Sequence, residues 1–479
     1  MEDIPAPQVF DGHGAGEGVP GGGGIHRLHR EGRHKGVHAL AQHIGPPRTQ
    51  LEHDVGRARA SLQGSGGGVD LLVVGQFAQT ADVSGVATGS MLLQTVTMVV
   101  TGLSMGITIL VGERIGRREP EDAGRAIGGG ICLFACFAVL LTAVLVGGAE
   151  VLARLMHAPE HAFHQTVLYI RICGAGSLFI VAYNVLGSIF RGIGDSRTPL
   201  LTVAIACVIN IFGDLLLVAG FHMGAAGAAL ATVAAQTVSV LVSLFLIRLR
   251  RRSLPFAFSR RHLRFHRDII GAELRLGTPV ALQELLVGTS FLLIQAIVNS
   301  MGVSIAAAFA VVNRIDDFAY TPEQNIGHAM TALMAQNKGA GKKDRLKEAF
   351  RCGIRIEVVY GIFIFIVCFL LADPLMRLFS SDAEVCGHGA TYLRLISFMY
   401  LLPAITNGIQ GYFRGIGDLK VTLISSFVNM GVRVIAAVIL VFVFSLQIEA
   451  LPISYLVGWI GMLIAELPLL VRSYRNYDR

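Results

Sequence analysis

The six-residue sequence FRGIGD stands at 190–195 and again at 413–418, an offset of 223 residues. The same offset holds without a gap over a long stretch, where it pairs Gly116 with Gly339, Ala126 with Ala349, Tyr169 with Tyr392, Arg171 with Arg394 and Asn184 with Asn407. Identities in one register over such a length indicate an internal duplication. The chain therefore contains two tandem copies of one unit.

Both copies are strongly apolar, since 53% of the 479 residues are hydrophobic and only 15% are charged. A soluble domain of ordinary composition does not contain so much apolar surface. The apolar stretches are roughly 20 residues long, the length that crosses a hydrocarbon core about 30 Å thick. They occupy 84–111, 124–147, 163–189, 198–219, 224–247, 276–299, 305–334, 352–372, 388–412, 421–445 and 450–471.

A shorter apolar stretch, VDLLVVGQFA at 69–78, precedes these eleven and has about half the length of a spanning helix. We therefore predict an all-α integral membrane protein of twelve transmembrane helices, the first one truncated, in two pseudo-symmetric six-helix bundles. Because each copy has an even number of spans, both copies enter the membrane in the same orientation. A pseudo-two-fold axis along the membrane normal should relate them, with substrate bound between the halves near the midplane.

The segment before the first apolar stretch is rich in Gly, His, Arg and Pro, and its seven histidines lack the regular spacing of metal ligands. We interpret it as disordered or non-native, and hypothesise that a wrong start site or a frameshift has replaced half of the first helix. An apolar run that ends at Val69 in another reading frame is then expected, and finding none would refute the hypothesis. The predicted domains are the N-terminal segment 1–68, the N-terminal bundle 69–248, a basic cytoplasmic linker 249–272 and the C-terminal bundle 273–479.

The Lys and Arg residues concentrate in the connections 112–125, 248–267 and 337–347, whereas 220–223, 300–304 and 446–449 carry none. Positive loops stay in the cytoplasm, so both termini are predicted to be cytoplasmic in a multi-pass protein of the cell membrane, the inner membrane where a cell has two. The net charge of +7 is thereby explained by topology, and no nucleic-acid partner is expected. The seven cysteines form no CxxC pair, so neither a disulfide framework nor a zinc site is predicted.

Ionisable side chains inside apolar stretches are functional candidates, because burying a charge in the membrane costs several kcal/mol unless it has a partner or a cavity. Asp70 lies on the truncated first stretch and Asp214 on the fifth, with Asn210 one helical turn before Asp214. A carboxylate and an amide oxygen stacked in this way make half of a small cation site, and Asp70 is the natural second carboxylate. Such a site can hold Na⁺ or protons, although structural, salt-bridged aspartates remain the alternative.

Several motifs carry a resemblance to the multidrug and toxic compound extrusion (MATE) family: the doubled FRGIGD, SRTPL after its first copy, VGQF, and ALMAQNKGAGKKDRLKEA after the eighth stretch. The resemblance covers residue 69 to the C-terminus. It implies two six-helix bundles around a V-shaped cleft and exchange of Na⁺ or H⁺ for amphipathic, often cationic drugs, without ATP or a cofactor. It also implies that Asn184 and Thr232 line the cation pocket of the first half, with a packing role as the alternative.

The second copy differs at the candidate site, because the offset of 223 takes Asp214 to Ala437 and Asn210 to Arg433. Some members of the family use a glutamate on the seventh helix, which Glu284 resembles by position, but Glu284 could instead neutralise Arg433 or Arg314. Adjacent side chains on a helix point about 100° apart, so at most one of Asp316 and Asp317 should face the cleft squarely. The second-half candidates for coupling or substrate binding are Glu284, Arg314, Asp316, Asp317 and Arg433.

The sequence thus predicts a monomeric secondary active exporter that exchanges H⁺ or Na⁺ for small drug-like compounds by alternating access. An enzyme is not predicted, because no HExxH, GxSxG or DDxxD-type cluster occurs within a span. A purely structural role is disfavoured by the cost of the buried carboxylates. The nearest alternative is a lipid-linked oligosaccharide flippase, in which Arg314 and Arg433 would hold a pyrophosphate. The FRGIGD segments are expected to form tight turns and not a phosphate-binding loop, which would need a GK[ST] ending.

Overall fold

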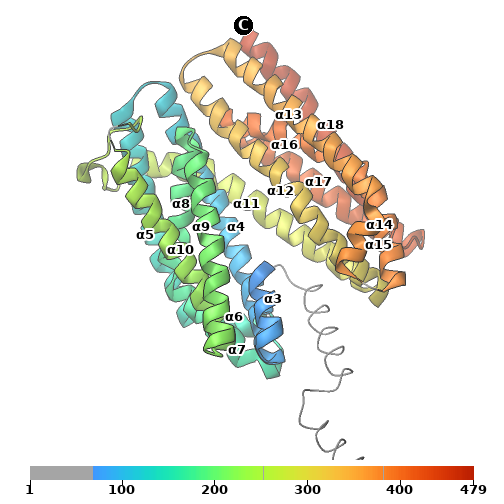
Figure 1. The fold of residues 1–479 in the computed structure, drawn as a ribbon. Coiled ribbons are helices and arrows are strands. Elements are labelled where there is room, and N and C mark those ends of the chain that lie inside the picture. The colour runs from blue at the N-terminus through green and yellow to red at the C-terminus, as the bar shows by residue number, and fades with distance from the viewer. Residues whose placement is uncertain (1–67, 252, 381, 479) are drawn as a thin grey trace, which may run out of the picture. The chain divides into compact units, whose positions relative to one another are not determined.

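The computed structural model describes residues 68–251, 253–380 and 382–478, and every regular element in these ranges is a helix (Figure 1). The predicted segment 1–68 lies outside the described residues except for Gly68. The first copy comprises α3 (Gly68–Phe77), α4 (Thr80–Gly116), α5 (Pro120–Gly147), α6 (Ala149–Leu155), η1 (Glu160–Ala162), α7 (Phe163–Ala175), α8 (Ser177–Ile193), α9 (Arg197–Asp214), η2 (Leu215–Gly220) and α10 (Gly224–Leu249).

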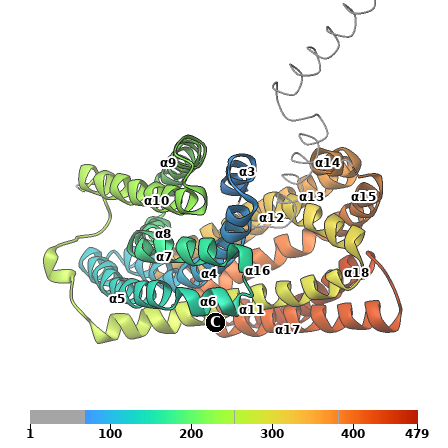
Figure 2. The same cartoon turned by 90° about the horizontal axis from the view of Figure 1, so that it is seen from below.

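The second copy follows a connection that contains the short η3 (Arg260–His262). It comprises α11 (Arg267–Asn299), α12 (Val303–Gly339), α13 (Lys343–Leu370), α14 (Ala372–Phe379), α15 (Ala383–Ser397), α16 (Leu401–Ile416), α17 (Leu419–Val438), η4 (Ile439–Val443) and α18 (Ala450–Asp478). All twelve predicted apolar stretches are thus helical, which confirms the predicted fold class. Figure 2 shows how α11 runs alongside α17 while also reaching α4 and α5 of the first copy.

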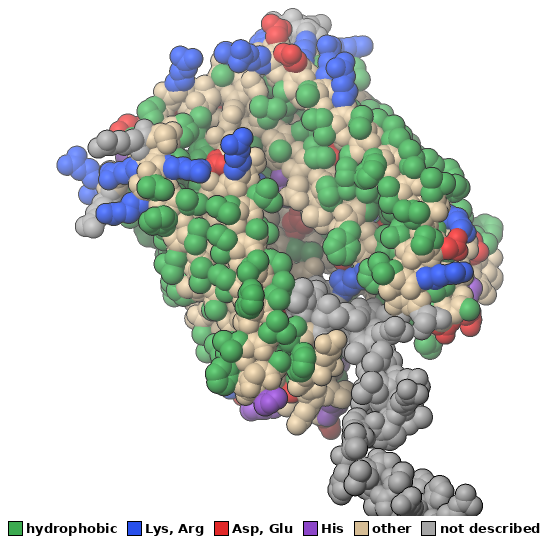
Figure 3. Space-filling view, in the orientation of Figure 1, with side chains coloured by type: hydrophobic (Ala, Val, Ile, Leu, Met, Phe, Trp, Pro, Cys, Tyr) green, Lys and Arg blue, Asp and Glu red, His purple; other side chains and the backbone are tan. Residues whose placement is uncertain are grey.

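Eight of the described helices are long and apolar enough to cross a membrane, and η1–α7 with α8, bent by 55°, makes a ninth span. The other predicted spans are α3, of which ten residues are described, the pair α15 and α16, and α12. The interior of α12 carries Arg314, Asp316, Asp317 and Glu323, which lower its hydropathy. Figure 3 shows hydrophobic side chains over the sides of the helices and Lys and Arg side chains gathered near the end that holds the C-terminus.

The duplication is visible in the helix boundaries themselves. An offset of 223 residues takes Thr80–Gly116 onto Val303–Gly339 and Pro120–Gly147 onto Lys343–Leu370. It also relates the π-helical segments η2 and η4, which follow α9 and α17. The two copies therefore share one backbone plan.

The two FRGIGD segments end α8 and α16 with the same turn. Gly194 and Gly417 have φ angles of 84° and 81°, a left-handed conformation that glycine adopts without steric cost. In each copy the glycine N–H and the following aspartate N–H donate to carbonyls of the last helical turn, as in a Schellman cap. The structure confirms the tight turn predicted from the sequence.

The two copies meet where α4 passes α12. A Cβ atom added at Gly116 would lie 2.0 Å from the Gln336 carbonyl oxygen, and one added at Gly339 would lie 2.1 Å from the Glu113 carbonyl oxygen. Because Glu113 and Gln336 are also related by the offset, the contact is the same in both directions, as expected around a two-fold axis. Only glycine permits this approach of the two backbones.

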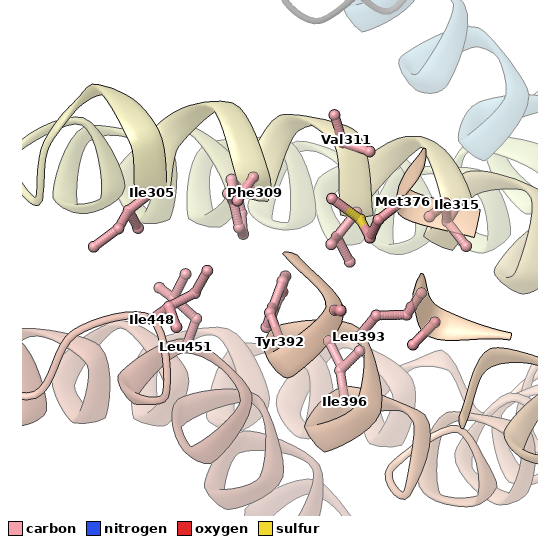
Figure 4. Packing of buried hydrophobic residues seen from close by; sticks show 14 of the residues in the cluster. Ile305, Phe309, Val311, Ile315, Met376, Tyr392, Leu393, Ile396, Ile448 and Leu451 are labelled. Carbon is pink, nitrogen blue, oxygen red and sulfur yellow. The ribbon is translucent and has the colours of Figure 1, made fainter. Parts of the chain in front are cut away.

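Each bundle has its own apolar interior. In the C-terminal bundle, α12 residues such as Phe309 pack against Tyr392 and Leu393 of α15, with Ile448 and Leu451 nearby (Figure 4). The N-terminal bundle has a buried apolar cluster of its own that includes Val100 of α4 and Phe134 of α5. Packing of this kind holds membrane helices together, since lipid tails are themselves apolar.

Candidate functional site

The fifth predicted span places Asp214 at the last residue of α9, where the helix widens into the π-helical η2. Asp214 is fully buried, and Asn210 lies one turn earlier on the same helix. The Nδ2 atom of Asn210 has no hydrogen-bond partner among the described residues. Widened turns of this type frequently occur at functional sites, since they redirect side chains and backbone carbonyls.

Thr232 and Asp214 each come directly after a residue at which α9 and α10 approach closely. A Cβ atom added at Gly213 of α9 would lie 2.9 Å from the Ala231 Cβ of α10. Asp214 and Thr232, the next residues on the two helices, therefore lie at the same level of the packed pair. The Thr232 hydroxyl donates to the Ala228 carbonyl at 3.0 Å. Two of the predicted site residues therefore lie at one helix contact.

Asn184 lies on α8, which contacts both α9 and α10. Its Oδ1 accepts a hydrogen bond from the Thr101 hydroxyl of α4 at 3.0 Å, and its Nδ2 donates to the Ile180 carbonyl at 2.8 Å. Sequence reasoning missed Thr101, which fixes the orientation of the amide.

The backbone of Asp70 belongs to α3, whereas its side chain is outside the described part of the structure. The helix α3 packs against α9, η2 and α10. The helices that carry Asp70, Asp214, Asn210 and Thr232 are therefore direct neighbours in the N-terminal bundle, and α8 with Asn184 adjoins two of them. Within the described ranges no group of three or more His, Cys, Asp or Glu side chains is arranged to hold a metal ion.

The second-half candidates are distributed differently. Arg433 is buried, donates to the Ser290 hydroxyl at 2.6 Å and lies 4.5 Å from the Tyr455 ring centre. Arg314 pairs with Asp317 at 3.3 Å. Glu284 has Arg414 as its cationic neighbour, which neither of the sequence alternatives included.

Asp316 and Asp317 point in different directions, as their spacing predicts. Asp316 accepts a hydrogen bond from the Tyr400 hydroxyl inside the C-terminal bundle, whereas Asp317 is exposed. Of the two aspartates, Asp316 is the one that belongs to the bundle interior.

A buried polar network on α11, α16, α17 and α18 was also missed. The Gln410 carbonyl accepts from Gln283 at 2.8 Å and from Arg414 at 2.6 Å, and the Gln410 amide donates to Ser426 at 3.1 Å. Ser425 donates to Glu466 at 2.7 Å. A scan for every acid within the apolar stretches would have found Glu466, as well as Glu323 and Glu357.

The helical repeat and its buried carboxyl groups define a duplicated, all-α membrane protein with polar groups inside each bundle. A family model described as MatE matches residues 60–216 and 279–439, one range in each copy. These ranges cover more than half of the chain, which therefore belongs to the MatE family.

Individual relatives agree with this assignment. The chain is 28% identical to the probable multidrug resistance protein YoeA of Bacillus subtilis over 82% of the chain and 86% of the relative. It is also 28% identical to the probable multidrug resistance protein YpnP of Bacillus subtilis, over 76% of the chain and 81% of the relative. A solved outward-facing structure of a multidrug resistance MATE family transporter has a TM-score of 0.80 at 22% identity, covering 88% of this chain and 94% of that one, which shows a common fold.

Proposed function

We propose that this protein is a secondary active exporter that exchanges H⁺ or Na⁺ for small, often cationic organic compounds. The observation that carries the proposal is the fully buried Asp214 at the junction of α9 and η2. Asn210 and Thr232 accompany it on packed helices, in a chain of the MatE family. The multidrug resistance names of the relatives support the choice of substrate class.

The coupling site of the proposal consists of Asp70, Asn184, Asn210, Asp214 and Thr232, and no further cofactor takes part. A carboxyl group in this position binds a cation from one side of the membrane, and its charge changes when it does. If the loaded and empty sites favour different tilts of the two bundles, and substrate favours one tilt, then cation entry drives substrate exit without a covalent step.

The contact between α4 and α12 supports alternating access. At one end of the bundles, Gly116 and Gly339 bring the two copies together, and Lys338 lies 3.5 Å from Glu113. By the distribution of basic loops this end is cytoplasmic, as are both termini. The surface in Figure 3 is hollowed between the two copies, away from that contact. A hollow on one side of the contact and closure at the contact are features of one of the two states that such a transporter needs.

The flippase alternative needs cationic side chains that are free to hold pyrophosphate. Arg433 is instead buried against Ser290 and Tyr455, and Arg314 pairs with Asp317. Because both arginines already have partners, the flippase is disfavoured, and this argument does not depend on the candidate cation site of the N-terminal bundle.

The proposal is tested with purified protein in liposomes loaded with a cationic dye. A pH gradient, a Na⁺ gradient, both or neither is imposed, and dye movement is followed by fluorescence. We expect movement to follow at least one of the cation gradients. Dye movement that is unaffected by either gradient would contradict the proposed antiport, and translocation of a lipid-linked oligosaccharide in the same vesicles would favour the flippase.

A further inference from the structure

Two glutamates in the C-terminal bundle have no role in the proposed coupling site. Glu323 of α12 and Glu357 of α13 are both fully buried, and none of their four carboxyl oxygens has a hydrogen-bond partner among the residues that the structure describes. A bare carboxylate inside a membrane bundle costs several kcal/mol, so such a group is a candidate for ligand or proton binding.

The two side chains belong to the same helix junction. One turn before Glu323, the Tyr320 hydroxyl donates to the Asn407 Oδ1 of α16 at 3.3 Å. One turn after it, a Cβ atom added at Gly327 would lie 3.1 Å from the Asn407 carbonyl oxygen. Glu323 therefore lies on the face of α12 that packs against α16 at Asn407.

Glu357 approaches the same segment of α16 from the other side. A Cβ atom added at Gly361, one turn after Glu357, would lie 3.2 Å from the Ala404 Cβ. One turn before Glu357, Gly353 packs against Met330 of α12. Glu357 therefore lies on the face of α13 that packs against α12 and α16.

An unused hydrogen-bond donor lies beside the two acids. Asn407 is only 8% exposed, and its Oδ1 accepts a hydrogen bond from the Tyr320 hydroxyl, while its Nδ2 has no partner in the described part of the chain. An amide N–H can donate to a carboxylate but cannot neutralise it. The junction thus offers a donor to one charged glutamate and no compensation for a second charge.

The other ionisable groups around the junction do not supply that compensation. Asp316 on α12 is a further acid and supplies no positive charge, and the phenols of Tyr320 on α12 and Tyr360 on α13 are neutral hydrogen-bonding groups. The hydroxyl of Tyr400, which precedes α16, donates a hydrogen bond to Asp316.

The nearest arginine on α16 is also occupied elsewhere. Arg414, further along the helix, donates to Gln410 and has Glu284 of α11 as its acidic neighbour. No ion pair within the described ranges includes Glu323 or Glu357.

The other copy shows that the fold does not require acids at these positions. The offset of 223 relates Glu323 to Val100 and Glu357 to Phe134, and both of these lie in one buried apolar cluster of the N-terminal bundle. A helix junction with the same backbone is thus stable with hydrocarbon side chains at these two positions. The two glutamates therefore serve something other than packing.

We propose that Glu323 and Glu357 form a proton-binding pair inside the C-terminal bundle, in which one carboxyl carries a proton and Asn407 donates to the other. Binding adds one proton to a carboxylate oxygen and reduces the charge of the pair from two to one; release returns the proton to water. Two like charges in a site without a cation are unfavourable, which favours the shared proton. Only the use of this proton in transport rests on the proposed function, where it would add a second coupling proton.

The pair is tested by infrared difference spectroscopy of the purified, full-length protein titrated from acidic to alkaline pH. The variants are Glu323→Gln, Glu357→Gln and the double variant, with Glu384→Gln as control because Glu384 is exposed on α15. We expect wild type and control to show a carboxylic acid C=O band that the double variant lacks. Proton uptake on acidification should fall by about one per chain in the double variant.

Either single variant removes one member of the pair and should also alter the band, so the test does not depend on the double variant folding. A band and a proton uptake that are unchanged in both single variants would overturn the proposal. The measurement needs no transport. A negative result for the proton-binding pair is therefore distinguishable from a negative result for the proposed antiport, which the liposome experiment tests.

Discussion

At the positions where the N-terminal bundle encloses Val100 and Phe134, the C-terminal bundle encloses Glu323 and Glu357. At the candidate cation site it is the first copy that has the acid, because Asp214 of the first copy corresponds to Ala437 of the second. The backbone nevertheless keeps the same helix ends and the same left-handed glycines. The comparison teaches that turn glycines and helix boundaries specify the bundle, while interior side chains can change between acid and hydrocarbon on an unchanged frame.

The largest effect is expected from breaking the contact that the two copies share. In Gly116→Leu the new side chain would meet the Gln336 carbonyl oxygen, since even a Cβ atom would lie 2.0 Å from it. The bundles can relieve this clash by separating, so the contact between α4 and α12 is lost and dye efflux should fall roughly tenfold or more. Gly339→Leu should act equally, because its Cβ would lie 2.1 Å from the Glu113 carbonyl oxygen.

The matched control for both variants is Gly431→Leu, because a Cβ atom at Gly431 has nothing within 4 Å. Efflux and the amount of folded protein are measured for all three variants. If Gly116→Leu transports as fast as Gly431→Leu, the contact has no part in the transport cycle.

A smaller change sharpens the comparison at the candidate cation site, where Thr232 of the first copy corresponds to Tyr455 of the second. Thr232→Val keeps the shape and removes the hydroxyl. Loss of one oxygen ligand or hydrogen bond worth about 1 kcal/mol should weaken the apparent cation affinity roughly fivefold. Thr237→Val is the control, since Thr237 makes the same type of bond to the carbonyl four residues earlier, at 2.7 Å. Equal cation dependence in the two variants would remove Thr232 from the proposed site.

The smallest effect concerns the aspartates that end the two FRGIGD motifs. The Asp195 carboxylate accepts from the Arg197 and Thr198 N–H groups at 3.0 and 3.1 Å and from the Thr198 hydroxyl at 2.6 Å. The Asp418 side chain accepts no hydrogen bond within the described residues, and it is exposed. Asp195→Ala should therefore cost about 1 kcal/mol of stability, as for loss of a helix N-cap, and Asp418→Ala close to nothing.

The difference between these two variants should depend on pH. Partial burial of Asp195 acts to raise its pKa. The hydrogen bonds from Thr198 and Arg197 and the nearby Arg250 have a larger combined effect in the opposite direction, so the pKa of Asp195 lies below the ordinary value for aspartate. The stabilisation is then complete above the ordinary pKa and is lost as pH falls through the lowered one. Thermal unfolding at neutral and acidic pH measures this. An equal loss of stability in Asp195→Ala at both pH values would contradict the assignment.

Much of the fold could be predicted from one repeated motif and the lengths of the apolar stretches. FRGIGD gave the register, and Gly194 and Gly417 adopt the turn that their glycine chemistry permits. The close approach of Gly116 to Gln336 could not be predicted, because it depends on how two distant helices cross. The change from α-helix to π-helix after Asp214 could not be predicted either, because the apolar sequence continues without interruption through α9 and η2.

The candidate site was only partly accessible to sequence reasoning. Asn210 and Asp214 follow from helical periodicity, and the structure adds the close approach of α9 to α10 at Gly213 and Ala231, the residues before Asp214 and Thr232. The partner of Glu284 was not found, because Arg414 belongs to the FRGIGD motif and was assigned to a turn, whereas its side chain is buried in the bundle. Glu323 and Glu357 were overlooked because neither forms part of a motif or of an identity between the two copies.

The most direct test of the account is dye transport by Asp214→Asn in liposomes with an imposed cation gradient. The substitution keeps the volume of the side chain and removes its charge at the end of α9. The account predicts that the variant folds and binds dye as the wild type does, while gradient-driven transport is abolished. Transport by Asp214→Asn that responds to the gradient as strongly as the wild type would contradict the claim that cation exchange is coupled at Asp214.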